Sequence, residues 1–372
     1  MLISTLARHR VRLRPRRPVA ARNPKAMPGL PKPTLPLDRN QPWRIGVYTG
    51  GEVIGDGLWK LPFVRVLRTA FPNAHITWMA RSHTVYASSL APVVEGLLDE
   101  VLDDSGIARK SSALLEPGLP VEKFDLLLDT QRTVWRAMYM RRLTRGLLIA
   151  PAMDYRFSMI KPPAAVAPTR HLGQLFVDWV GWITGEAVMP DRSLAIPAAA
   201  QEAAKKAMPD DQAVYVGFVP GAGDREKCWP LANFIAVAKA LMAENPAIKP
   251  VFMLGPDEID WRDDIANAVP EALFPEQAPN QWPEAVPGPL RAMAVGERLK
   301  AAVSNDCGTG HMLAAVDCPL LTLFGPTEPA KFKPLNNAAT ALLQAQDYGA
   351  GHAMALIPVE AVTDALRSLL DH

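Results

Sequence analysis

The chain has 372 residues, of which 49% are hydrophobic and 21% charged, and its formal net charge is +2. This length favours two domains, and the composition is that of a globular protein without a membrane-spanning helix, because no run approaches the roughly 18 uncharged apolar residues that such a helix needs. The three cysteines are odd in number and show no CxxC spacing, so neither a disulfide framework nor a zinc site is indicated, and the reducing cytoplasm is the expected compartment.

The positive charge is concentrated at the start of the chain. Residues 1–26 hold eight Lys or Arg and no acid, which leaves 32 basic and 38 acidic residues in the remainder. That mildly acidic body gives no indication of a nucleic-acid partner. We expect residues 1–42, which are basic and then rich in proline, to form a disordered leader. The alternative is a polybasic strip that contacts anionic lipid at the membrane surface.

The first ordered segment alternates strands and helices. Near-continuous apolar strands of this kind are typical of parallel sheets with helices on both faces, so residues 43–205 are predicted to form a Rossmann-like domain. The predicted strands are 44–50, 75–80 and 124–130, and the predicted helices are 56–71 and 132–145.

A second α/β series is predicted over residues 206–355, followed by a C-terminal helix over 356–372. The stretch 189–212 combines proline, alanine and charge and is the expected domain boundary, and the proline-rich 256–297 is expected to be mostly surface loop. Ligands bind at the carboxyl ends of strands in such sheets, so two domains facing each other would enclose a cleft. The predicted strands are 213–220, 250–255, 299–306 and 319–325, with helices at 231–244 and from Gly310.

The segment "TGGEVIGDGLWKLP" (49–62) carries the first candidate site. Gly50 and Gly55 have the spacing of a phosphate-binding P-loop, but Asp56 stands where that loop needs lysine, and the dinucleotide fingerprint fails at Lys60. Two interpretations of Asp56 remain: a helix cap, which is favoured on local pattern, or a general base.

Two further strand–turn–helix segments, both in the second domain, have the pattern of an anion-binding site. In "VPGAGDREKCWP" (219–230), Lys227 is either a phosphate ligand or an ordinary surface lysine. In "SNDCGTGHMLAA" (304–315), Asp306 either accepts bonds from a sugar hydroxyl or caps the helix, and His311 either donates to phosphate or is satisfied by backbone. The loop "FGPTEP" (324–329) is predicted to face the same edge.

Together with "FDLLLDTQRTVWRAMYMRRLTRG" and "VFMLGPDE", these segments occur in the order found in glycosyltransferase family 9, and the chain resembles its ADP-heptose-using lipopolysaccharide heptosyltransferases over residues 44–334. The resemblance implies a GT-B fold of two Rossmann-like domains, with the acceptor in the first and the nucleotide sugar in the second. It also implies that the C-terminal helix packs back across the domains.

By position, Asp56 matches the catalytic aspartate of the family and Lys227 its diphosphate-binding lysine. The donor motif falls on Asp306, Cys307, Gly308, Thr309 and His311, and Glu258 falls where an acidic residue contacts the nucleoside. The implied reaction is an inverting, metal-independent heptose transfer to the lipopolysaccharide inner core at the cytoplasmic face of the inner membrane.

The chain departs from the family pattern at Cys307, where Thr or Ser is usual, and at Gly57, where an apolar residue is common. The turn before Lys227 also offers no Ser or Thr. These departures leave the donor sugar open. Three alternatives remain: transfer of another sugar or to another acceptor, a GT-B-fold sugar-nucleotide epimerase, and a non-catalytic binding protein.

Overall fold

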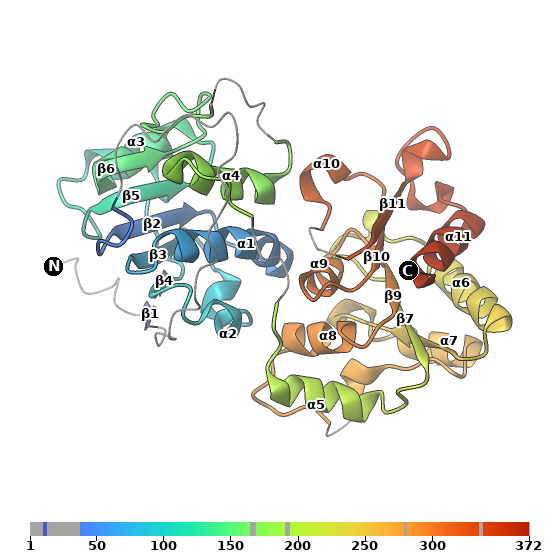
Figure 1. Cartoon of the computed structure of the whole chain (residues 1–372). Coiled ribbons are helices and arrows are strands. Elements are labelled where there is room, and N and C mark those ends of the chain that lie inside the picture. The colour runs from blue at the N-terminus through green and yellow to red at the C-terminus, as the bar shows by residue number, and fades with distance from the viewer. Residues whose placement is uncertain are drawn as a thin grey trace. The chain divides into compact units, whose positions relative to one another are not determined.

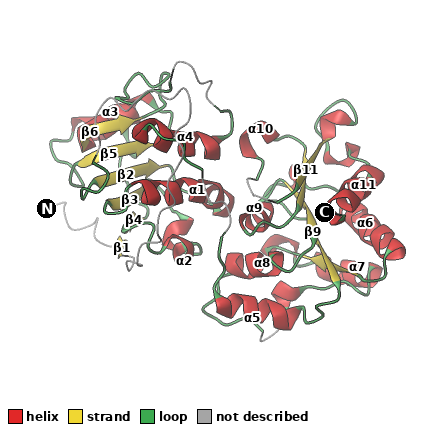
Figure 2. Ribbon diagram, viewed as in Figure 1, coloured by secondary structure: helices red, strands yellow, loops and turns green. Residues whose placement is uncertain are grey.

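The computed structural model describes residues 10–12, 38–163, 169–189, 194–278, 281–334 and 338–371. It divides into two compact α/β units, Met1–Asp191 and Arg192–His372. In each unit the strands form a sheet that is flanked by helices (Figures 1 and 2). The division lies within 189–212 but before the boundary expected at 205–206. Helix α5 (Ala198–Ala207) accounts for the difference, because it packs on α8 (Gly288–Gly296) of the second unit.

The sheet of the first unit has the order β1-β4-β3-β2-β5-β6. Neighbours from β4 to β6 run parallel, and β1 pairs with β4 in the antiparallel direction. The three strands predicted in this unit are confirmed, whereas β4 and β6 were not foreseen. The strands are β1 (Arg10–Arg12), β2 (Arg44–Thr49), β3 (His75–Ala80), β4 (Glu100–Leu102), β5 (Phe124–Asp129) and β6 (Thr144–Ile149).

Most of the expected leader lies outside the described residues. Its described part differs from the expectation, because Arg10–Arg12 form a strand. The described chain resumes at Asp38. Arg39 donates both terminal nitrogens to the Glu186 carboxylate at 2.9 Å, a bidentate pair that ties residues before β2 to the end of this unit.

The helices of the first unit are α1 (Ile54–Ala70), α2 (Ala91–Val94), α3 (Val134–Leu143) and α4 (Leu172–Thr184). α1 and α4 pack on each other through aromatic rings: Phe176 of α4 lies 5.7 Å from both Trp59 and Phe63 of α1, centroid to centroid. The prediction that a helix extends to 145 is wrong at its end. Thr144 already belongs to β6, where its hydroxyl donates to the carbonyl of Phe124 in β5.

The sheet of the second unit is parallel throughout, with the order β11-β10-β9-β7-β8. The four predicted strands are confirmed to within a few residues, and α6 has the predicted bounds. The elements are β7 (Val214–Val219), α6 (Leu231–Glu244), β8 (Ile248–Phe252), β9 (Ala301–Asn305), α9 (Gly308–Ala315), β10 (Leu320–Phe324), α10 (Pro329–Phe332) and β11 (Thr340–Gln344).

The prediction of surface loop over 256–297 is wrong. This stretch contains α7 (Trp261–Ala268) and α8, and α8 buries Leu290, Met293 and Val295. Pro287 and Pro289 mark the start of α8 rather than the absence of a helix, since Pro at the first helical positions has no amide that needs a partner.

The C-terminal helix α11 (Val359–Leu370) packs on α6 and on β9, β10 and β11. Val362, Leu366 and Leu369 are buried with the core of the second unit. α11 is therefore an integral part of that unit rather than a separate segment.

Candidate functional site

Both sheets have a point where the strand order reverses. In the first unit the chain runs from β2 outward to β3 and β4 and then returns to β5 on the other side of β2. In the second unit it runs from β7 to β8 and returns to β9. Ligands bind outside the carboxyl ends of the strands at such a switch point. The β2/β5 and β7/β9 pairs therefore indicate where each unit binds its ligand.

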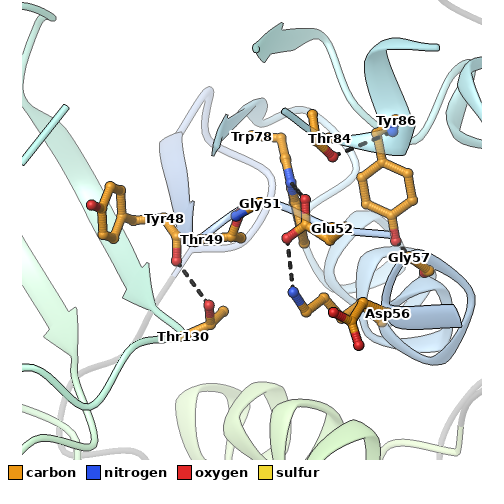
Figure 3. Close-up of polar contacts among 12 residues, drawn as sticks. Tyr48, Thr49, Gly51, Glu52, Asp56, Gly57, Trp78, Thr84, Tyr86 and Thr130 are labelled. Carbon is orange, nitrogen blue, oxygen red and sulfur yellow. Dashed lines mark hydrogen bonds and ion pairs between the residues drawn. The ribbon is translucent and has the colours of Figure 1, made fainter. Parts of the chain in front are cut away.

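Asp56 lies in the first turn of α1, directly after the turn that follows β2 (Figure 3). It is not the helix cap: Val53 occupies that position and no side chain caps the helix. One Asp56 oxygen accepts a hydrogen bond from Trp59 Nε1 at 3.0 Å, and the side chain is half-buried. The second oxygen has no hydrogen bond to any described residue. Asp56 is thus oriented by one contact and remains able to accept a proton.

Two glycines are required by close packing, Gly51 in the turn and Gly57 in the first turns of α1. Gly51 has φ +115°, and a Cβ there would collide with Ser82 Oγ, whose hydroxyl donates to the carbonyl of Gly50. Gly57 has no room for the apolar residue common in the family, because an added Cβ would lie 2.6 Å from Val85 Cγ2. Tight packing against the segment after β3 explains this departure.

A buried ion pair that the sequence analysis missed supports the same turn. Lys60 Nζ lies 2.7 Å from Glu52 Oε1, and Glu52 Oε2 accepts from Trp78 Nε1 at 3.2 Å (Figure 3). Lys60 and Glu52 are 5% and 6% exposed. The available signal was a lysine on the otherwise apolar face of α1, one turn after Asp56. This network joins the turn, α1 and β3.

Asp129 is a second missed residue, at the carboxyl end of β5 and paired in register with Tyr48 of β2. Its side chain is fully buried. Oδ1 accepts the Gln131 backbone N–H at 2.9 Å, whereas Oδ2 has no partner among the described residues. Burial raises the pKa of Asp129 to about 7, against the bond from Gln131 and the opposing charge of Arg136.

In the second unit, Asn305 at the end of β9 fixes the turn after β7. Its Oδ1 accepts from Trp229 N at 3.0 Å and its Nδ2 donates to the Pro220 carbonyl at 2.8 Å. Trp229 is fully buried and donates Nε1 to the Ile357 carbonyl. One amide therefore clamps both ends of the 220–229 turn. An asparagine at a strand end was the signal that sequence reasoning passed over.

This clamp brings Lys227 and Asp306 together. Lys227 Nζ lies 3.4 Å from Asp306 Oδ2, and the Asp306 side chain is 9% exposed. Asp306 does not cap α9, because Cys307 occupies the cap position. The helix-cap interpretation of Asp306 is therefore wrong. Lys227 likewise is not an unpaired surface lysine, since a carboxylate holds it at the end of β9.

The donor-motif residues form the start of α9. Cys307 precedes it without a side-chain cap bond, Gly308 and Thr309 are its first two residues, and the half-buried His311 follows within its first turn. Burial raises the pKa of the Cys307 thiol to about 12, so it is neutral at physiological pH. The helix N-terminus presents backbone amides with the favourable end of its dipole, a geometry suited to phosphate.

Gly310 is required by packing. An added Cβ would lie 2.6 Å from Ser304 Oγ, which is buried and has no hydrogen-bond partner among the described residues. This close approach brings α9 against the end of β9.

The predicted "FGPTEP" loop follows the neighbouring strand β10 at the same carboxyl edge of the sheet. Thr327 Oγ1 in this loop is also buried without a partner in the described chain.

Glu258 reaches this edge from the end of β8. It is 6% exposed and packs against Gly221, where a Cβ would lie 2.6 Å from Glu258 Oε2. Arg225 approaches it at 4.0 Å, donates to the Asp257 carbonyl and stacks over Trp261. Burial raises the pKa of Glu258, opposed by the charge of Arg225. Arg225 was not singled out from the sequence.

The seven predicted residues of the second unit thus gather at the carboxyl edge of one sheet, and Asp56 lies at the corresponding edge of the other. Within the described ranges, no three His, Cys, Asp or Glu side chains are arranged to hold a metal ion. No helix of the described chain is long and apolar enough to cross a bilayer. The predicted residue of the first unit is Asp56, and those of the second unit are Lys227, Glu258, Asp306, Cys307, Gly308, Thr309 and His311.

Comparison with known proteins places this arrangement in a family. Residues 119–353 match the family described as glycosyltransferase family 9 (heptosyltransferase). The lipopolysaccharide heptosyltransferase 3 of Escherichia coli is 25% identical over 303 residues, which cover 76% of this chain and 84% of that protein. The lipooligosaccharide heptosyltransferase 2 of Haemophilus influenzae is 32% identical over 129 residues, 34% of this chain; the match spans about a third (35%) of that relative.

The fold agrees with these matches. The structure of an Escherichia coli heptosyltransferase with ADP superimposes with a TM-score of 0.58 at 19% identity, covering 88% of this chain and 99% of that one. The predicted GT-B class of two Rossmann-like units is confirmed. The chain belongs to glycosyltransferase family 9, the heptosyltransferase family.

Proposed function

We propose that this protein transfers heptose from ADP-heptose to the inner core of lipopolysaccharide, with inversion at the anomeric carbon. The similar proteins named above are lipopolysaccharide and lipooligosaccharide heptosyltransferases, and one of them was solved with ADP. The observation that carries the proposal is the pairing of Lys227 with Asp306 at the start of α9, at the switch point of the second unit.

We assign the donor to this edge of the second unit. The Lys227 ammonium and the amides of Gly308 and Thr309 would neutralise the diphosphate, and His311 would donate to it. Glu258, in the turn that follows β8, is the candidate for the nucleoside hydroxyls. Charge that develops on the departing ADP would meet preorganised donors, which is usually the largest contribution to catalysis.

We assign the acceptor to the first unit, with Asp56 as the general base. The acceptor hydroxyl passes its proton to the Asp56 carboxylate while its oxygen forms the new bond to the anomeric carbon. The bond from that carbon to the ADP oxygen breaks on the opposite face, and ADP leaves with the bonding electrons. Trp59 orients the carboxylate through its 3.0 Å hydrogen bond, so the proton is accepted by the other oxygen.

The proposal also gives the protein a place of action. A lipopolysaccharide-core acceptor is anchored to the cytoplasmic face of the inner membrane, and the eight basic residues within 1–26 would add attraction to anionic lipid. Sedimentation with anionic liposomes checks this part: removal of residues 1–26 should reduce binding, and unchanged binding would refute it.

The reaction is tested with the purified chain, ADP-heptose and graded lipopolysaccharide-core acceptors, with product masses read by mass spectrometry. We expect addition of one heptose by the wild type. Asp56→Asn should lower kcat by about 10²- to 10⁴-fold, the usual contribution of a general base, with unchanged ADP affinity. Wild-type turnover in Asp56→Asn would refute the base, and the absence of transfer from ADP-heptose to every core acceptor would refute the proposed function.

A further inference from the structure

The switch point of the first unit contains a glutamine that none of the preceding assignments uses. Gln131 follows β5, and its side chain lies over Gly50, the residue that follows β2: an added Cβ at Gly50 would be 3.2 Å from Gln131 Oε1. β2 and β5 are the two strands between which the strand order reverses. The amide therefore lies where this fold binds its ligand, at the start of the turn that leads to Asp56.

The backbone of Gln131 is held in place by a buried group. The fully buried Asp129 accepts the Gln131 N–H at 2.9 Å. Thr130 donates both its N–H and its hydroxyl to the Tyr48 carbonyl, at 3.0 and 3.1 Å. In Figure 3, Thr130 and Asp56 appear on opposite sides of the Gly51 turn. Thr130 is thus fixed to β2 and Gln131 to the end of β5 before any ligand binds.

The Gln131 side chain itself retains free hydrogen-bonding capacity. Nε2 donates one hydrogen to Thr130 Oγ1 at 3.3 Å, and no described residue donates to Oε1. The side chain is half-buried, and neither Oε1 nor the second N–H makes a hydrogen bond to any described residue. An uncharged amide that offers one acceptor and one donor is complementary to a hydroxyl, which donates and accepts, rather than to a phosphate.

We propose that Gln131 determines acceptor specificity by binding a hydroxyl of the acceptor sugar, and that Asp129 is the positioning residue that holds Gln131 over Gly50. This inference rests on the proposed function for the identity of the acceptor. Asp129 acts only through the backbone of Gln131. It follows that an acceptor lacking the recognised hydroxyl loses affinity, because the amide is then left without its partner.

The chain provides a matched control. Asp210 and Gln212 repeat the same local geometry, with Asp210 Oδ1 accepting the Gln212 N–H at 2.9 Å, but they are exposed and precede β7 at the opposite edge of the second sheet. Substitutions of Asp210 and Gln212 remove the same chemical groups at a place that is not the switch point.

The test uses the full-length protein. Acceptor and donor KM, kcat, and direct acceptor binding by titration calorimetry are measured for Gln131→Ala, Asp129→Ala, Asp129→Asn and the controls Gln212→Ala and Asp210→Ala. We expect Gln131→Ala to raise the acceptor KM and Kd about tenfold with unchanged donor KM. Asp129→Ala should act in the same direction. Asp129→Asn should remain within about twofold of wild type, because its amide oxygen still accepts the Gln131 N–H.

The outcomes separate the two proposals. Wild-type transfer combined with wild-type acceptor Kd in Gln131→Ala refutes the role of Gln131 alone. An equal loss in Asp129→Asn and Asp129→Ala refutes positioning by the Asp129 oxygen, and so does a KM change in the two controls. If the wild type neither binds nor glycosylates the core acceptor, the proposed function fails and the inference fails with it. Circular dichroism verifies that each variant is folded.

Discussion

Asp129→Asn gives the sharpest prediction about stability, because it removes a buried ionisation while keeping the shape of the side chain. Asp129 is fully buried, and its pKa is raised to about 7, mainly by burial, from an ordinary value of 3.8. As the pH rises above 3.8, the unfolded chain gives up this proton first. The folded state then binds more protons than the unfolded state, so stability falls between about pH 4 and pH 7 and stays constant above that range.

The magnitude follows from the two pKa values. At about 1.4 kcal/mol per tenfold change in proton affinity, the step from 3.8 to about 7 corresponds to at most about 4 kcal/mol of lost stability above pH 7. Asn cannot ionise and still accepts the Gln131 N–H, so Asp129→Asn should restore most of this stability at pH 8.5. At pH 3.5 the carboxyl is protonated in the folded state and mostly protonated in the unfolded state, so the two proteins should be nearly equal in stability.

Urea denaturation followed by tryptophan fluorescence at pH 3.5, 6 and 8.5 measures this difference between variant and wild type. Asp210→Asn is the matched control, since the same Oδ1 contact exists there on an exposed residue. A gain for Asp129→Asn that is independent of pH, or an equal gain for Asp210→Asn, would refute the argument that buried charge limits the stability of the first unit.

Three further substitutions test packing and charge by equilibrium unfolding. Lys60→Met should cost about 3–5 kcal/mol, because it leaves the Glu52 carboxylate buried without its cation; adding Glu52→Gln should recover much of the loss, and no recovery would contradict the pairing. Gly310→Ala should cost about 1–3 kcal/mol, because its Cβ would lie 2.6 Å from Ser304 Oγ, and adding Ser304→Ala should relieve the clash; a double variant as unstable as the single one would contradict this. Cys307→Ser should stabilise the protein by about 1 kcal/mol, because a hydroxyl oxygen accepts a stronger cap bond than the thiol does from the N–H groups of Thr309 and Gly310, whereas Cys307→Ala should not; equal effects of the two would argue against capping.

The buried carboxylate of Asp129 and the proposed role of Gln131 have a common physical basis. Activity and stability often compete at functional positions. A buried carboxylate that lowers folding stability is therefore consistent with a role in the ligand site. Asp129→Asn separates the two effects: it should raise stability at high pH and leave acceptor binding nearly unchanged. A variant that gained stability but lost acceptor affinity would assign the charge itself, rather than the oxygen, to the site.

The sequence by itself determined the parallel α/β class, most strand positions and the strand–turn–helix location of each predicted residue. Apolar runs that end in glycine or polar residues encode these features locally, so "RIGVYTG" and "AVYVGFVP" correspond to β2 and β7. The prediction from sequence failed for the proline-rich segment 256–297. Local pattern there cannot reveal that α8 is buried by α5 and α9, which come from other parts of the chain.

Only the tertiary structure decided which polar residues act together. Asp56 and Asp306 resemble helix caps in sequence, but Val53 and Cys307 occupy those positions, because α1 begins three residues too early and α9 one residue too late for these aspartates to cap them. The Lys60–Glu52 pair and the Asp129–Gln131 contact were likewise not predicted from the sequence. The desolvation of a polar side chain depends on which distant parts of the chain pack around it. A local sequence pattern does not specify those neighbours.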